Sequence, residues 1–140
     1  MIAYFDTSAV IPLLVGEPSS GTCTRLWNEA ARSISVRLLY PEARAALARA
    51  ERMGRITARA HAAALIELET IVTEIDHIEI TAELARDAGD LAQAHRLRGY
   101  DAVHLAGALV AHDAELVLVT RDNDLAGAAN ALGLSVALAR

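Results

Sequence analysis

The chain has 140 residues, a hydrophobic content of 54% and a formal net charge of −5. This length suits one domain with its own core and is too short for two, and the acidic balance argues against broad, non-specific binding to nucleic acid. All 13 basic residues are arginine, so the absence of lysine excludes a P-loop lysine, a Schiff base and the lysine of a phosphate-accepting receiver domain.

Strand and helix signals alternate through the first half of the chain. Glycine and proline end several of the apolar stretches, and hydroxyl residues stand where helices should start. The predicted elements are a strand over 2–5, helices over 8–15 and 19–32, a strand over 33–36, a helix over 41–53, and a long helix that starts at Thr57.

The second half continues the same alternation. Its predicted elements are a strand over 75–80, a helix over 81–97, a helix starting at Asp101, a strand over 116–120, a helix over 123–132, and a final edge strand over 134–138. Strands that alternate with helices are typical of a parallel sheet covered by helices. The sequence therefore predicts an α/β fold, with one domain over residues 1–140.

Four acidic residues occupy positions that such a fold brings together. Asp6 follows the first strand and Asp122 follows the strand over 116–120, so both should project into the crevice beyond the carboxyl ends of the strands. Glu42 and Asp101 lie near the starts of helices that can open onto the same edge. Each acid alone is explained as a helix cap or a first-turn acid, but four together would repel one another without a cation. Hard oxygen ligands suit Mg²⁺ or Mn²⁺, which predicts metal-dependent phosphodiester chemistry.

Four short segments give the chain a family resemblance: Phe5–Ala9, Tyr40–Arg44, Gly99–Ala106 and Val119–Asp122. In order and spacing they are similar to the motif blocks of PIN-domain nucleases, and the whole chain most resembles the VapC toxins of bacterial toxin–antitoxin modules. The resemblance implies an α/β/α sandwich with a central parallel sheet and Mg²⁺- or Mn²⁺-dependent endoribonuclease activity on RNA. It also implies a homodimer and inhibition by a small VapB-like antitoxin.

The resemblance further implies roles for the acids. Asp6, Glu42 and Asp101 match the three most regular acids of the family, and Asp122 matches its variable fourth. Asp124, two residues further on, could replace Asp122 or support it. The expected metal ligands are Asp6, Asp101 and Asp122, while Glu42 would ligate through water or accept the proton of the attacking water.

Two further sets of side chains surround this predicted site. Small hydroxyl groups that match the family pattern are expected to hydrogen-bond the carboxylates: Thr7, Ser8 and Thr120. Four arginines near the acids form a candidate rim for RNA phosphates: Arg44, Arg49, Arg96 and Arg98. For the two on the helix over 41–53, the alternative is an ordinary solvated helix face. His104, on nearly the same helix face as Asp101, is interpreted as a packed or supporting histidine.

Two other functions remain as alternatives. A catalytically inactive PIN-like module would bind RNA or protein without cutting, and the presence of all four acids argues against it. A haloacid-dehalogenase-type phosphatase also begins with a strand that ends in aspartate, but it usually has a second aspartate two residues on, where this chain has Ser8.

No run of residues is long and apolar enough for a membrane span, and no basic segment leads into a signal-type core at the amino terminus. The sequence therefore predicts a cytoplasmic protein.

Overall fold

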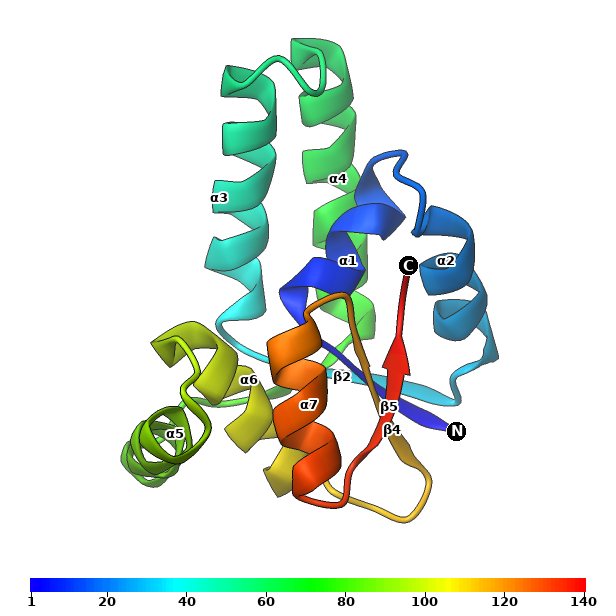
Figure 1. Ribbon diagram of the computed structural model, residues 1–140. Helices are drawn as coiled ribbons and strands as arrows, with labels where there is room; N and C mark the ends of the chain where they lie inside the picture. The colour runs from blue at the N-terminus through cyan, green and yellow to red at the C-terminus, as the bar shows by residue number, and fades with distance from the viewer.

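A five-stranded sheet forms the centre of the computed structural model, which describes residues 1–140 (Figure 1). Its strand order is β3-β2-β1-β4-β5, and every neighbouring pair is parallel, which confirms the predicted α/β class. The strands are β1 (Ile2–Phe5), β2 (Arg32–Val36), β3 (Asp76–Ile78), β4 (Leu116–Thr120) and β5 (Ser135–Leu138).

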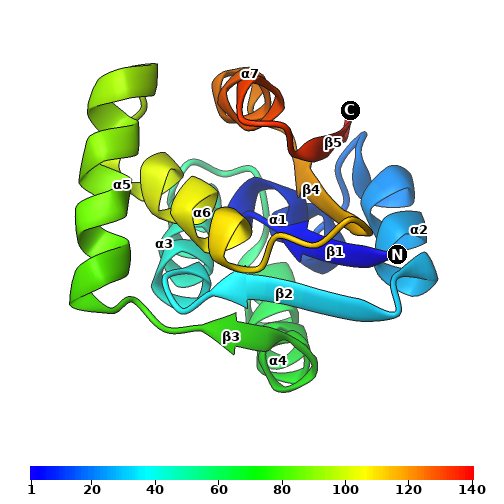
Figure 2. The ribbon, with the colours of Figure 1, turned by 90° about the horizontal axis from the view of Figure 1, so that it is seen from below.

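Helices cover both faces of this sheet (Figure 2). They are α1 (Thr7–Leu14), α2 (Ser20–Glu29), α3 (Leu39–Arg52), α4 (Ala58–Glu74), α5 (Ala82–His95), α6 (Gly99–Val110) and α7 (Asn123–Ala131). None of them is both long and apolar enough to cross a membrane.

Alternation along the central strand β1 divides the core into two halves. Ala3 and Phe5 pack into a cluster with side chains from α1, α2, α3 and α4, whereas Tyr4 packs into a cluster with side chains from α5, α6 and α7. Successive side chains of a strand point to opposite faces, so the strand contributes to both halves. This three-layer arrangement is the predicted α/β/α sandwich.

Side-chain caps start four of the helices. Asp6 accepts a hydrogen bond from the backbone N–H of Ala9 at the start of α1, and Asp122 accepts two such bonds at the start of α7. Thr57 and Thr81 cap α4 and α5 in the same way, at the residues where the sequence predicts these helices to begin. Each cap pairs a helix N–H that has no partner within the helix.

Two predicted boundaries of the first half are wrong. The second helix ends at Glu29 because Arg32 already pairs with Ile2 as the first residue of β2. The third helix starts at Leu39, so Pro41 is its third residue and not its first. The proline loses no hydrogen bond there, since the first N–H groups of a helix have no acceptor within it.

Two boundaries of the second half also differ. The strand β3 covers only Asp76–Ile78, because its partner β2 ends at Val36, which pairs with Ile78. The helix α6 begins at Gly99, so Asp101 lies inside its first turn. The side chain of Asp101 is therefore free to face another group instead of capping its own helix.

The order of the strands creates a crevice between β1 and β4. From β1 the chain proceeds through α1 and α2 to β2 on one side, and from β4 it proceeds through α7 to β5 on the other. The connections diverge beyond the carboxyl ends of these two strands, which is where open parallel sheets bind ligands.

Candidate active site

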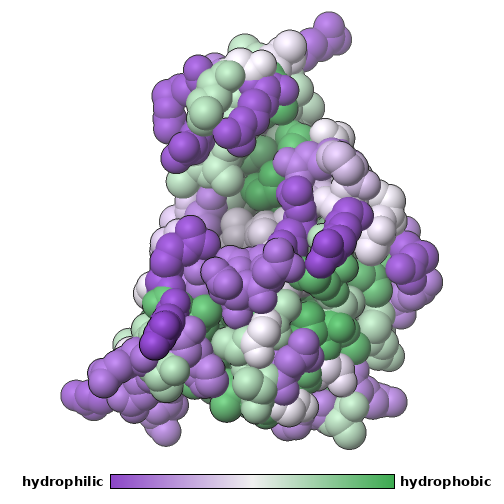
Figure 3. Space-filling model, viewed as in Figure 1, coloured by the Kyte–Doolittle hydropathy of each residue, from purple (hydrophilic) through white to green (hydrophobic).

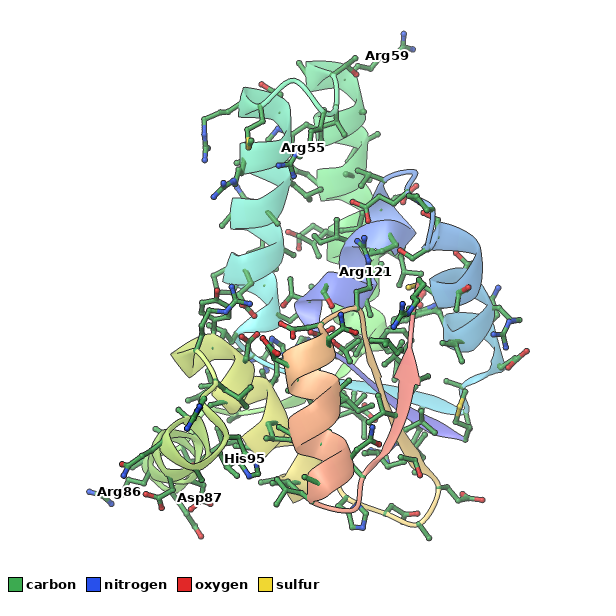
Figure 4. All side chains as sticks on the ribbon, viewed as in Figure 1. Arg55, Arg59, Arg86, Asp87, His95 and Arg121 are labelled. Carbon is green, nitrogen blue, oxygen red and sulfur yellow. The ribbon has the colours of Figure 1, made fainter.

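The predicted acids meet at this crevice. Asp6 directly follows β1 and Asp122 follows β4 by one residue, while Asp101 and Glu42 come from the first turns of α6 and α3. Oxygen atoms gather where the ends of α1, α3, α6 and α7 meet (Figure 4), and the surface there is hydrophilic (Figure 3). The amino ends of α1, α6 and α7 all contribute to this site, and the positive end of a helix dipole favours an anion.

Asp6 is the most buried of the four acids, with 4% of its surface exposed. One carboxylate oxygen, Oδ1, accepts hydrogen bonds from the Ser8 hydroxyl at 2.7 Å and the Ala9 N–H at 3.3 Å, and Oδ2 accepts one from the Thr120 hydroxyl at 3.0 Å. Burial nevertheless raises the pKa of Asp6 to about 6, although these hydrogen bonds act in the opposite direction. The carboxylate is thus held in place by hydrogen bonds, and a nearby cation would stabilise its ionised form.

Hydroxyl groups connect Asp6 to the loop after β4. Thr120, the last residue of that strand, is fully buried and also accepts a hydrogen bond from the backbone N–H of Asp122 at 3.0 Å. Ser8 accepts one from the N–H of Arg121 at 2.9 Å. Ser8 and Thr120 therefore support the carboxylate and fix the turn that places Asp122 beside it.

Arg98 joins the other two aspartates. Its Nε donates to Oδ2 of Asp101 at 2.9 Å, its Nη2 donates to Oδ2 of Asp122 at 3.3 Å, and its guanidinium lies 4.7 Å from the ring centre of Tyr100. Burial raises the pKa of Asp101, with the hydrogen bond from Arg98 acting in the opposite direction and the negative charge of Asp122 adding to the rise. A cation thus already lies between two of the predicted metal ligands.

Glu42 is held by a separate set of contacts. Its Oε1 accepts a hydrogen bond from the hydroxyl of Thr7 at 2.8 Å and lies 2.6 Å from Nε2 of His104. His104 is 2% exposed, and its Nδ1 lies 3.0 Å from the hydroxyl of Tyr4. His104 therefore supports an acid of the site, as a packed or supporting histidine would.

Four other predicted residues lie away from the acids. Asp124 and Arg96 line a hollow of about 400 Å³ between the end of α5 and α7, and the backbone N–H of Asp124 donates to Oδ1 of Asp122. Arg44 donates to the Tyr40 hydroxyl, and Arg49 donates to the sulfur of Met53, the residue just after the end of α3. Of the four rim arginines, Arg98 alone contacts the acids, and it does so as an ion-pair partner.

The donor set fits a hard divalent cation in chemistry. It consists of carboxylates whose burial leaves them short of positive charge, and the guanidinium of Arg98 stands between two of them as a cation would. No three histidine, cysteine, aspartate or glutamate side chains converge as a ready-made metal site in this arrangement. Binding of a metal would therefore require these side chains to close around it.

A sequence model of the PIN domain matches residues 3–131, which includes every acid of the site. The chain belongs to the PIN domain family. This PIN domain is 42% identical over 139 residues to Ribonuclease VapC45 of Mycobacterium tuberculosis, and the match covers 99% of this chain and 96% of the relative.

Solved structures share the fold of this PIN domain. VapC20 of Mycobacterium tuberculosis, described as a toxin that cleaves the sarcin–ricin loop, superposes with a TM-score of 0.69 at 24% identity and covers 99% of this chain and 98% of its own. VapBC2 of Rickettsia felis, solved on a DNA fragment of its promoter, has a TM-score of 0.66 at 12% identity and covers 98% of both chains.

The sequence pattern does not predict the roles of two residues of the PIN domain site. Arg98 was assigned to an RNA rim, although an arginine three residues before an acid at a helix start can reach that acid on the same face. Tyr4 was treated as part of an apolar strand, although a buried tyrosine hydroxyl usually needs a hydrogen-bond partner.

Proposed function

We propose that this PIN domain is a metal-dependent endoribonuclease that acts as the toxin of a VapBC-type toxin–antitoxin module. The observation that carries the proposal is the set of four acids at one crevice: Arg98 and Thr120 connect the three aspartates, and Thr7, the residue after Asp6, donates to Glu42. The 42% identity to a protein named as a ribonuclease supports the type of reaction.

Asp6, Asp101 and Asp122 would hold Mg²⁺ or Mn²⁺, which polarises a phosphoryl oxygen and lowers the pKa of bound water. The amino ends of α1, α6 and α7 favour the approach of a phosphodiester to the same place. Thr120 and Ser8 keep Asp6 in one orientation, so this carboxylate needs no reorganisation when a substrate arrives.

Glu42 would accept the proton of the attacking water. Its Oε1 already takes hydrogen bonds from Thr7 and His104, whereas its Oε2 has no donor within the protein. The free oxygen is the one available to a water molecule, directly or through a metal ligand.

Arg98 would change partners when RNA binds. Its guanidinium side chain is largely exposed, so it can leave Asp101 and Asp122 without unfolding any element. In the complex with RNA it would pair with a phosphate, for which the planar guanidinium is well suited.

The partners of the proposed toxin follow from its relatives. A toxin–antitoxin complex from Klebsiella pneumoniae shares the fold, and a VapB-like antitoxin is the corresponding partner proposed for this chain. We also propose that the chain forms a homodimer and that it acts on RNA in the cytoplasm.

Cleavage of total cellular RNA by the purified protein tests the proposal. Wild type with Mn²⁺ or Mg²⁺ should give discrete cuts that disappear with EDTA and in Asp6→Asn. Glu67→Gln, which removes an exposed carboxylate of α4 without a side-chain partner, is the matched control and should cut like wild type. RNA that stays intact with wild type while Mn²⁺ still binds would favour the inactive binding module.

A further inference from the structure

A chain of polar side chains runs from the core to the site. The hydroxyl of Tyr4 lies 3.0 Å from Nδ1 of His104, and Nε2 of the same ring lies 2.6 Å from Oε1 of Glu42 and 3.2 Å from Oγ1 of Thr7. These four residues come from β1, α6, α3 and α1, so the contacts join four separate elements.

The distances fix where the protons lie. A carboxylate can only accept, so the short contact with Glu42 requires a hydrogen on Nε2 of His104. Tyr4 is fully buried, and a phenol carries its hydrogen near neutral pH, so its hydroxyl can donate. In the neutral imidazole Nδ1 is then the acceptor, and Tyr4 donates to it.

The backbone of α6 leaves room for this tyrosine. A Cβ at Gly107 would lie 2.8 Å from the hydroxyl oxygen of Tyr4, closer than real Cβ contacts are found, and 3.3 Å from its ring, which is tighter than most. Tyr4 meets the imidazole edge-on, with the ring planes at 82°. Gly107 is therefore what allows the hydroxyl to reach Nδ1 of His104 in a packed core.

The far end of the chain of contacts determines the orientation of Glu42. Thr7 and His104 both donate to Oε1, so the carboxylate cannot rotate without losing two hydrogen bonds. The ring that donates is itself 2% exposed and held from the other side by Tyr4. A buried pair thus decides which oxygen of Glu42 remains free.

We propose that Tyr4 and His104 are positioning residues of the nuclease: Tyr4, together with Glu42, holds His104 in its Nε2–H form, and His104 fixes Glu42 for its role in the reaction. Neither residue touches the substrate. The part of this inference that concerns the reaction rests on the proposed ribonuclease function, whereas the part that concerns the imidazole does not.

Heteronuclear NMR of the imidazole nitrogens tests the first half, in metal-free protein at about pH 8, well above the ordinary histidine pKa. Wild type should show His104 with its hydrogen on Nε2 alone. Tyr4→Phe, which removes one oxygen and keeps the ring, should admit a measurable share of the Nδ1–H form, because Glu42 alone then holds the hydrogen on Nε2, and Gly107→Ala should do the same. Gly127→Ala, at a helical glycine with no neighbour within 4 Å, is the control and should match wild type. An unchanged His104 signal in Tyr4→Phe would overturn the inference.

RNA cleavage with Mn²⁺ tests the second half. Tyr4→Phe and His104→Leu should lower kcat by about tenfold or more, as loss of an orienting hydrogen bond does in metal sites, with little change in KM. His104→Gln should recover much of the rate, because its amide N–H can replace Nε2–H. Equal rates for His104→Leu and His104→Gln, with equal thermal stability, would show that the ring serves only packing. If wild type cuts no RNA, the proposed function fails, and the NMR comparison still decides the imidazole form.

Discussion

Replacing Asp6 by asparagine should stabilise the metal-free protein while it removes activity. Burial raises the pKa of Asp6 from 3.8 to about 6, so the folded state binds this proton more tightly than the unfolded state does. At 1.36 kcal/mol per unit of pKa, the ionised side chain destabilises the fold by up to about 3 kcal/mol above pH 7. Asparagine carries no charge and can still accept hydrogen bonds from Ser8 and Ala9 through its oxygen.

The amide group of the asparagine would face the Thr120 hydroxyl and lose one hydrogen bond, which costs about 1 kcal/mol. The net gain is then about 1–2 kcal/mol, and at roughly 4 °C per kcal/mol for a chain of this size Tm should rise by about 4–8 °C. Thermal unfolding followed by circular dichroism in EDTA measures this difference. Glu67→Gln should leave Tm nearly unchanged, as surface substitutions usually do.

The stability difference between Asp6→Asn and wild type should depend on pH. The folded-state pKa of Asp6 lies above its ordinary value, so the destabilisation is absent well below pH 3.8, grows as the pH rises, and is complete above about pH 6. The gap in Tm between variant and wild type should therefore be full at about pH 7.5, roughly a third as large near pH 5, and absent or slightly reversed near pH 4, where the lost hydrogen bond dominates. Other groups titrate in both proteins and cancel in the comparison. A variant that is less stable than wild type at about pH 7.5, or a gap that does not change with pH, would refute the reasoning.

Three further predictions concern the cation of the site, the choice between two acids, and the core. Arg98→Ala should bind Mn²⁺ several-fold more tightly by titration calorimetry without RNA, because the guanidinium no longer competes with the metal for Asp101 and Asp122. Arg86→Ala, at an exposed residue of α5, is the control and should leave the affinity unchanged. Weaker Mn²⁺ binding by Arg98→Ala would contradict this role of Arg98. Asp122→Asn should reduce RNA cleavage by more than about tenfold and Asp124→Asn by much less, while the reverse order would make Asp124 the fourth acid. Leu105→Ala, at a fully buried position, should lower the unfolding free energy in urea by about 2–5 kcal/mol, and a loss below 1 kcal/mol would mean that α6 is loosely packed.

The sequence predicted the class of fold because local signals and the global arrangement agree. Threonines cap α4 and α5 where they were expected, and the uninterrupted Leu/Val run of β4 is buried beside the central strand. Acids that follow neighbouring parallel strands meet at one edge of the sheet, so the strand pattern alone places Asp6 and Asp122 together. Glu42 and Asp101 lie near helix starts, which can open onto the same edge but are not required to, and the family resemblance added their roles.

The remaining features depend on the directions of side chains, which are set by packing across the chain. The 2–5 strand pattern does not reveal that Tyr4 reaches a histidine 100 residues later through the space above Gly107. For the same reason the sequence does not distinguish between the four predicted rim arginines. Arg44 donates to the Tyr40 hydroxyl, whereas Arg98 donates to the acids of the site. The end of α2 and the length of β3 differ from the prediction because pairing with a neighbouring strand sets them.

The three helix amino ends at the crevice have a consequence for how such a domain can change in evolution. Their positive ends belong to the backbone and persist whatever side chains line the site, whereas the carboxylates can each be lost by one substitution. A descendant without its acids would keep the same fold but present an electropositive hollow, suited to holding a phosphate instead of cutting beside it. The architecture thus gives a short physical route from a nuclease to an RNA-binding module, in which the acids alone separate the two.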